Sequence, residues 1–220
     1  MRLSIILFDG FTALDVVGGY EVLANLPGME VEFVAAVPGL VATDTGSLGM
    51  QACQTFAALE ATDILYVPGG PGVAAAIADS ALLDCVRRVS PTCAWTVSVC
   101  NGAEILGAAG LLDGRRVTTN WFARERVAAY GAQVTNERYV RDGQLVTGAG
   151  VSSSIDMGLF LAGLLAGEEV AQTIQLAIEY YPDPPYGNGT PDQQPPQRQQ
   201  IIAAVERGAA KRLAARRIPF

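Results

Sequence analysis

The chain has 220 residues, of which 50% are hydrophobic and 17% are charged, as is typical of a globular fold with a sizeable core. We therefore expect one domain over residues 1–220. The net charge of −7 argues against non-specific binding to nucleic acid or to an anionic membrane. The chain contains no histidine, which excludes a Ser-His-Asp triad, a Cys-His dyad and imidazole metal sites.

The predicted elements begin with alternating strands and helices. Branched apolar runs that end in turn residues predict strands, and apolar residues at helical spacing predict helices. Strands are predicted at residues 3–8, 29–37, 63–67 and 94–100. Helices are predicted at residues 12–26, 82–89 and 101–112, and another begins after the glycine-rich turn at 68–72.

The second half continues with a strand at 115–120, a helix at 122–131, a hairpin at 137–150 and a buried helix at 153–167. This alternation predicts an α/β fold of the flavodoxin-like kind, a three-layer sandwich with a mostly parallel sheet and helices on both faces. Ligands of such folds bind outside the carboxyl ends of the strands, where connections diverge. Three loops are expected there, at residues 9–15, 69–72 and 100–101.

A proline-rich segment at 182–197 interrupts this pattern and leads to a predicted terminal helix at about 198–217. The segment is either a lid or oligomer contact, or a plain surface connector. Six of the fifteen basic residues lie at 198–220 beside one acid, a local charge of +5 against −12 for the rest. This basic helix is a solvated face or a clamp on an acidic partner subunit, and less plausibly an arm that binds nucleic acid.

The compartment is expected to be the cytoplasm. The first residues hold only a short apolar run and no small-residue cleavage site, so we expect no signal peptide. The longest apolar stretch, at 157–167, is too short to span a bilayer. The four cysteines should then be free thiols, and the lack of CxxC spacing argues against metal or redox-pair sites.

Cys100 stands where a predicted strand passes into a helix, an arrangement that resembles the nucleophile elbow of hydrolases. The helix start favours an anion, which predicts a lowered pKa for the thiol. The alternative is a small buried residue without chemistry. Packing is the favoured interpretation for Cys53, Cys85 and Cys93.

Two other features are candidates for the same site. The glycines at 68–72 offer backbone amides to a ligand, although the P-loop lysine and the dinucleotide-binding spacing are absent. Asp15 and Glu21 are not on one helix face, so at most one of them points into a given pocket, and each is otherwise a solvated acid or a cap. Without histidine, a carboxylate is the preferred proton carrier if Cys100 is catalytic.

These pieces together resemble the ThiJ/PfpI superfamily and, within it, the isocyanide hydratases. The similar stretches are LDVVGGYEVLANLP, VPGGPGV, VSVCNGAEILGAAGLLDGRRVTTNW, ERYVRDGQLVTGAGVSSSIDMGL and IQLAIEYYPDPPYGNGTPD. They run in order to about residue 195. The cysteine elbow indicates only the superfamily, whereas the Asp15 segment and the proline-rich run resemble the hydratases in particular.

The resemblance implies that Cys100 is the nucleophile and Asp15 its acidic partner, with the amides of Gly70 and Asn101 beside them. It also implies a homodimer with its site near the subunit interface, and no cofactor or metal. Trp121 and Val151 are our further predictions for the wall of a narrow, apolar substrate pocket, and Trp121 is equally well explained as a core residue.

Two positions depart from the pattern. Asn101 replaces the threonine that follows the cysteine in the hydratases, and could alter hydrogen bonding at the sulfur. Asn120 replaces the histidine before the tryptophan in many relatives. The second change argues against chemistry that needs an imidazole.

The expected activity is hydration of an isocyanide to an N-substituted formamide through a thioimidate on Cys100, with Asp15 as proton carrier. The alternatives are another cysteine-dependent enzyme of the superfamily, an amidase or a glyoxal-type hydratase, or a thiol oxidation sensor without catalysis. A regulator with a helix-turn-helix domain is disfavoured, because only one helix fits after the proline-rich run.

Overall fold

A seven-stranded sheet forms the centre of the computed structural model, which describes residues 1–215. The strands lie in the order β10-β11-β7-β6-β1-β2-β5, and all neighbours are parallel except β10 and β11. Their bounds are β1 Arg2–Ile6, β2 Glu30–Ala35, β5 Gln54–Thr55, β6 Ile64–Val67, β7 Trp95–Val99, β10 Tyr139–Asp142 and β11 Leu145–Gly148. The predicted mostly parallel sheet is confirmed.

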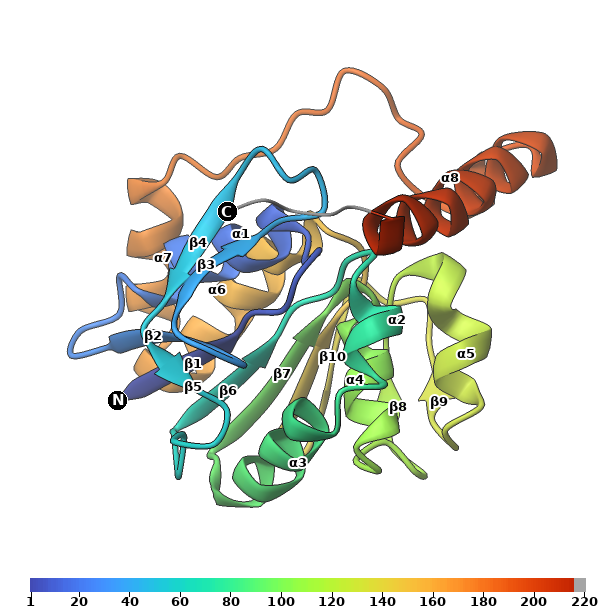
Figure 1. The fold of residues 1–220 in the computed structure, drawn as a ribbon. Coiled ribbons are helices and arrows are strands. Elements are labelled where there is room, and N and C mark those ends of the chain that lie inside the picture. Colours follow the sequence, from blue (N-terminus) through green and yellow to red (C-terminus); the bar gives the residue numbers. More distant parts are fainter. Residues whose placement is uncertain (216–220) are drawn as a thin grey trace.

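Helices cover both faces of this sheet (Figure 1). One layer holds α1 Ala13–Leu23, α6 Ser153–Ala166 and α7 Glu168–Ala177, and the other holds α2 Val73–Ala76, α3 Ser80–Val89, α4 Ala103–Ala108 and α5 Arg124–Ala128. Both faces of the central strands are therefore buried, which explains why β6 and the end of β7 are apolar or small at successive positions. The predicted three-layer α/β sandwich is confirmed.

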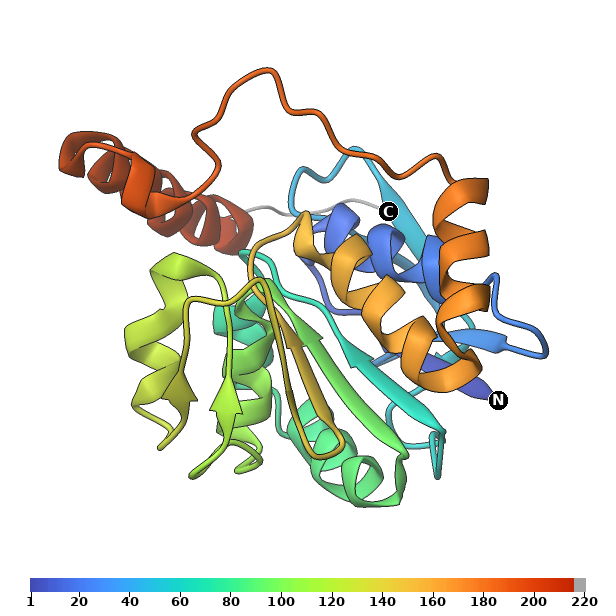
Figure 2. The same cartoon turned by 180° about the vertical axis from the view of Figure 1, so that it is seen from behind.

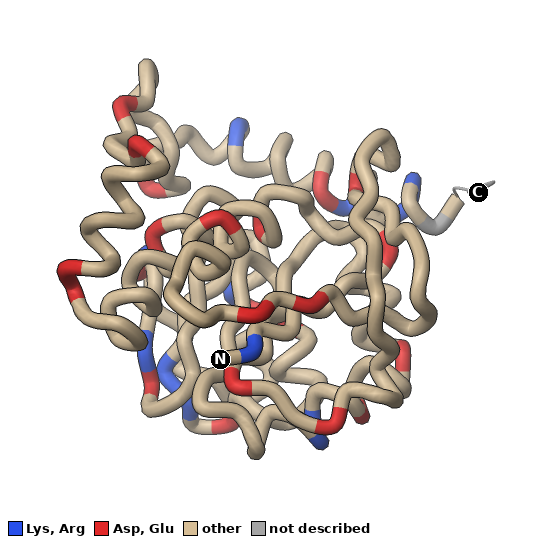
Figure 3. Tube along the Cα trace, turned by 90° about the vertical axis from the view of Figure 1, so that its left-hand side faces the viewer, with Lys and Arg blue, Asp and Glu red and all other residues tan. Residues whose placement is uncertain are grey.

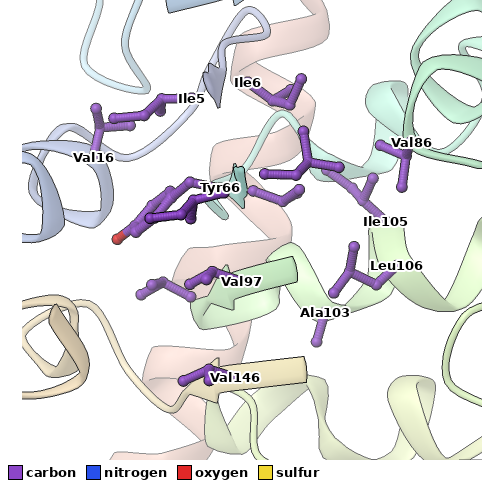
Figure 4. Close-up of a cluster of buried hydrophobic side chains, with 14 of the residues drawn as sticks. Ile5, Ile6, Val16, Tyr66, Val86, Val97, Ala103, Ile105, Leu106 and Val146 are labelled. Atoms are coloured by element: carbon purple, nitrogen blue, oxygen red, sulfur yellow. The ribbon is translucent and has the colours of Figure 1, made fainter. Parts of the chain in front are cut away.

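Branched and aromatic side chains of the strands and helices form one core cluster, part of which is drawn in Figure 4. Tyr66 is its largest fully buried member. The ring packs in this cluster, and the hydroxyl points out of it on the side of Val16 (Figure 4). That hydroxyl donates a 2.5 Å hydrogen bond to the backbone carbonyl of Asp15, so Tyr66 ties α1 to the sheet.

Two glycines that weaken the helical pattern of α1 have a packing role. A side chain at Gly18 would collide with Ser154 of α6, and one at Gly19 would collide with the ring of Tyr66. The glycines therefore allow α1 to lie close to both α6 and the sheet.

Several predicted elements have different bounds, and some were missed. Four features were not predicted from the sequence: the β3–β4 hairpin (Gly39–Ala42 and Gly49–Ala52), β5, β9 (Gln133–Val134) and α7. The predicted strand at 115–120 is only β8, Arg116–Val117, and it pairs with β9 outside the central sheet. The helix after Cys100 ends at Ala108 rather than 112, since Gly110 adopts a positive φ there.

The long segment after α7 is irregular apart from a 3-10 turn at Pro191–Gln193. It leads to α8, Pro196–Ala215, which begins two residues before the predicted start, whereas the predicted residues 216–217 lie outside the described part of the chain. Figures 1 and 2 show the C-terminal end of α8 near the carboxyl ends of the central strands, with the rest of the helix extending away above the layer of α2, α4 and α5. Among residues 1–215, no helix has the length and apolarity needed to cross a bilayer.

Candidate active site

Three loops meet where the chain connections diverge between β1 and β6, as the sequence analysis predicts. The backbone N–H of Thr12 donates to the carbonyl of Gly69 at 2.9 Å, and the N–H of Gly72 donates to the carbonyl of Gly10 at 3.1 Å. The third loop, which begins at Cys100, joins them through the side chain of Asn101. The carboxyl ends of three neighbouring strands thus bring Asp15, the glycine-rich turn and Cys100 together.

Cys100 has the backbone of a nucleophile elbow. It follows the last residue of β7, opens a 3-10 turn that runs into α4, and has a φ of 57°, which a residue with a side chain rarely adopts. Its carbonyl accepts a 2.7 Å hydrogen bond from Thr119 Oγ1 and a 3.3 Å bond from the N–H of Asn120. These bonds hold the strained residue in place, and its thiol is buried with 3% exposure.

Asp15 lies in the first turn of α1 and is fully buried. Its Oδ2 accepts a 2.8 Å hydrogen bond from the N–H of Gly69, whereas its Oδ1 has no such partner among the described residues. Burial is the main reason why the pKa of Asp15 is raised to about 8. The hydrogen bond from Gly69 lowers this pKa, and the negative charge of Asp44 raises it by a smaller amount. The Cys100 side chain has the smallest influence on this pKa and lowers it.

The pKa of the Cys100 thiol is raised well above its usual value, so the predicted lowering is wrong. Burial is the main cause and the negative charge of Asp15 the second. Two donors act in the opposite direction: Nδ2 of Asn120, 3.3 Å from the sulfur, and the backbone N–H of Asn101. The helix-start dipole is outweighed because the sulfur is removed from water and lies beside an acid.

Asn101 bonds the glycine-rich turn rather than the sulfur through its side chain. Its Oδ1 accepts from the N–H of Gly70 at 2.7 Å, and its Nδ2 donates to the carbonyl of Gly70 at 3.2 Å. The amide of Gly70 is therefore engaged by Asn101 in this state and does not face the cavity as a free donor. The side chain that contacts the sulfur is instead that of Asn120, which was not predicted as a site residue.

Cys100 lies at the wall of a cavity of about 440 Å³. Val151 lines this cavity, as do Gly70 and Asn101. Trp121 does not; it lines a separate hollow beside residues 188–202 and packs edge-on against Phe122. The other lining residues are Thr12, Asp44, Thr45, Pro71, Asn120, Phe122, Glu206, Ala209, Arg212 and Leu213.

The remaining candidates lie elsewhere. Glu21 is exposed on α1 and does not line the cavity of Cys100. Cys85 and Cys93 are buried in the core cluster, as predicted, whereas Cys53 is exposed. No group of three or more histidine, cysteine, aspartate or glutamate residues in the described chain could hold a metal ion.

The mostly parallel α/β sheet, the cysteine at the nucleophile elbow and the neighbouring acid place the protein in the class of α/β proteins with an elbow cysteine. Residues 1–163 match the model of the DJ-1/PfpI family. The chain belongs to that family, and the predicted ThiJ/PfpI membership is confirmed.

Individual relatives give finer information. An isonitrile hydratase of Pseudomonas putida is 40% identical over 89% of this chain and 85% of its own length. The crystal structure of a ThiJ/PfpI family protein from Pseudomonas syringae has a TM-score of 0.90 at 32% identity, covering 97% of this chain and 89% of that chain. The helix-turn-helix transcriptional regulator CdhR of Pseudomonas aeruginosa is 33% identical over 51% of this chain, a match that covers 34% of the regulator.

Proposed function

We propose that the protein is an isocyanide hydratase, which converts R–N≡C and water into an N-substituted formamide. The observation that carries the proposal is the buried pair of Cys100 and Asp15, a nucleophile and a proton carrier without any imidazole. The isonitrile hydratase that resembles nearly the whole chain supports the same reaction, since isonitrile and isocyanide are two names for one group.

The first step uses the pair in its singly ionised form. Because burial raises the pKa of both groups, they carry at most one negative charge near neutral pH. With the charge on sulfur and the proton on Asp15, the sulfur forms a bond to the isocyano carbon. Asp15 delivers its proton to the same carbon, and one carbon–nitrogen π bond is lost. The product is a thioimidate, S–CH=N–R, beside an ionised Asp15.

Hydrolysis then regenerates the enzyme. The Asp15 carboxylate accepts a proton from water as the water oxygen bonds to the thioimidate carbon. Asp15 passes this proton to the nitrogen. As the carbon–sulfur bond breaks and its electron pair returns to sulfur, the hydroxyl oxygen forms the carbonyl and gives its proton to Asp15, which releases the formamide and restores the thiolate beside protonated Asp15. The donors Asn120 Nδ2 and Asn101 N–H stabilise the departing thiolate.

We further propose that the chain acts as one domain and as a cytoplasmic homodimer. Apolar side chains exposed on helices of the outer layer and on α8 support a partner surface: Leu14, Val17, Leu164, Ile201, Ile202 and Val205. Light scattering on the whole protein tests this. A dimer that persists unchanged after deletion of residues 198–220 would show that α8 takes no part in it.

A thiol sensor is the weaker alternative. Oxidation follows thiolate character and exposure, and Cys100 is buried with a raised pKa. Binding to nucleic acid is not proposed, since the net charge is −7 and acidic residues are spread over most of the chain in the view of Figure 3.

The test is incubation of the purified protein with an aryl isocyanide, with formamide followed by chromatography. Cys100→Ala and Asp15→Asn are assayed beside it. Formamide from the unmodified protein alone supports the proposal. Turnover of methylglyoxal or of an amide without isocyanide activity would overturn it in favour of another enzyme of the family.

A further inference from the structure

The cavity of Cys100 has polar walls, although a narrow apolar pocket was predicted, and the glycine-rich turn after β6 forms part of them through Gly70. Each backbone N–H of residues 69–73 already has a partner inside the protein. Pro71 has no N–H, and the other partners are Asp15 Oδ2 for Gly69 at 2.8 Å, Asn101 Oδ1 for Gly70 at 2.7 Å, the Gly10 carbonyl for Gly72 at 3.1 Å and the Gly70 carbonyl for Val73 at 3.1 Å. Asp15 belongs to the reacting pair, so the bond from Gly70 to Asn101 is the one that a further side chain controls.

Asn101 is fixed against the turn by two hydrogen bonds. Its Oδ1 accepts from the N–H of Gly70, and its Nδ2 donates to the carbonyl of Gly70 at 3.2 Å. A Cβ at Gly69 would collide with Asn101 Oδ1 and would lie 2.8 Å from the Asn101 backbone nitrogen, so the turn and the loop of the nucleophile lie in close contact. Asn101 Oδ1 therefore occupies the position in front of the Gly70 N–H, at a wall of the cavity that also holds Cys100.

This position matters for reactions at a carbonyl group. When a thiolate attacks a carbonyl carbon, the carbon–oxygen π bond breaks and its electron pair moves to the oxygen. Donors that face this oxyanion are worth about 100-fold to 1000-fold in rate each. The backbone N–H of Asn101 and Nδ2 of Asn120 act on the sulfur. The N–H of Gly70 is blocked by Asn101 Oδ1, whose lone pairs would also repel an oxyanion.

Hydration of an isocyanide does not need this donor. In the first step the electron pair appears on the isocyano carbon, which takes the proton of Asp15. In the second step Asp15 removes a proton from the water as its oxygen bonds to carbon, so no full charge accumulates on oxygen. The bond between Asn101 and Gly70 is therefore unfavourable for carbonyl substrates alone.

We propose that Asn101 is a specificity-determining residue: its side chain withholds the Gly70 N–H as an oxyanion donor and restricts Cys100 to substrates, such as isocyanides, whose addition leaves no charge on oxygen. The inference rests on the proposed hydration reaction and explains how the site rejects carbonyl substrates.

Two reagents of similar size separate oxyanion stabilisation from the reactivity of the sulfur. With p-nitrophenyl acetate, the Cys100 thiolate bonds to the carbonyl carbon, and collapse of the oxyanion expels p-nitrophenolate and leaves an acetyl group on sulfur. With p-nitrobenzyl bromide, the thiolate displaces bromide in one step and no oxyanion forms. Both rates at Cys100 are followed by peptide mass, and the ratio of acylation to alkylation cancels differences in the thiolate population.

The unmodified protein gives the first comparison, with glutathione as a thiol that has no donors arranged around it. We expect the acylation-to-alkylation ratio of Cys100 to lie within about tenfold of that of glutathione, since the donor is blocked. A ratio further above that of glutathione would show a working oxyanion hole and overturn the proposal. This comparison decides the matter even where a substituted protein does not fold.

Substitutions give the second comparison. Asn101→Ala frees the Gly70 N–H and should raise the ratio about tenfold or more. Asn101→Asp keeps an acceptor for that N–H and should leave the ratio no higher than in the unmodified protein. Asn25→Ala removes an exposed asparagine at the end of α1, where its Nδ2 bonds the carbonyl of Glu21, and is the matched control with an unchanged ratio. A folded Asn101→Ala protein whose ratio is not raised would overturn the proposal.

The same proteins are assayed with an aryl isocyanide, so that the two proposals fail separately. The ratio of ester acylation to isocyanide turnover should rise about tenfold in Asn101→Ala. A raised acylation-to-alkylation ratio in Asn101→Ala, from a protein that turns over no isocyanide, would overturn the hydration reaction and retain the blocked donor.

Discussion

Replacing Asp15 with asparagine should stabilise the fold at neutral pH. The carboxyl is fully buried, and its pKa is raised from 3.8 to about 8 in the folded protein. The folded state therefore holds this proton more tightly than the unfolded chain does. The stability that the proton provides is fully present below pH 3.8 and is lost progressively as the pH rises toward 8.

The magnitude follows from the size of this window. At pH 7 the carboxyl is ionised in the unfolded chain and protonated in the folded protein. Because pH 7 lies roughly three units above the pKa of 3.8 and each unit is worth about 1.4 kcal/mol, this difference lowers the free energy of unfolding by about 4 kcal/mol. Asparagine is nearly isosteric, never ionises, and keeps an oxygen that can accept from the N–H of Gly69. We therefore expect Asp15→Asn to exceed the wild type in stability by up to about 4 kcal/mol at pH 7 and by about 1 to 2 kcal/mol at pH 5.

Urea unfolding at pH 5, 6 and 7, at one protein concentration and followed by tryptophan fluorescence, measures this difference. Glu125→Gln removes an exposed acid and should show no comparable trend. An Asp15→Asn variant that is no more stable than the wild type at pH 7, or a difference that does not grow with pH, would refute the reasoning that the carboxyl is forced to hold a proton.

Three further substitutions test the supports of the site. Asn120→Ala removes the 3.3 Å donor to the sulfur and should slow alkylation of Cys100 by iodoacetamide about tenfold at neutral pH; an unchanged rate would show that the thiolate does not use this bond. Asn101→Ala leaves the buried N–H of Gly70 without its partner and should lower the free energy of unfolding by about 1 to 3 kcal/mol, whereas Asn101→Asp, which keeps an acceptor, should recover part of it. Gly70→Ala should cost more than about 2 kcal/mol in urea unfolding, because Gly70 has a φ of 140° and a Cβ there would lie 2.5 Å from the carbonyl of Gly10; wild-type stability would contradict this packing.

The sequence predicted the site's centre because that centre is built from strand ends. A branched apolar run that stops at a glycine or a cysteine identifies the carboxyl end of a parallel strand, and such ends meet at one edge of the sheet. The meeting of the loops at 9–15, 69–72 and 100–101 follows from this rule, whereas the choice of Asp15 over Glu21 rested on the family resemblance. The β3–β4 hairpin was missed since its strands are short and only partly buried, which leaves weak periodicity.

The rest of the site depends on contacts that no local pattern encodes. Asn120 reaches the sulfur from the loop after β8, and Glu206 reaches the cavity from α8. The direction of the thiol pKa was wrong for a related reason. A dipole at a helix start can be inferred from neighbouring residues, whereas complete burial beside a second acid is set by the packing of distant segments.

The cavity is lined both by loops at the strand ends and by α8, so its substrate specificity can change without a change in the reacting groups. The reacting groups are fixed by loops tied to the sheet, whereas Glu206 and Arg212 line the cavity from α8, which follows a long irregular connection. Substitutions on that helix can exchange one class of substituent for another while the bonds around Cys100 stay intact. Libraries that randomise the inward face of α8 alone are therefore a direct route to hydratases with altered substrate range.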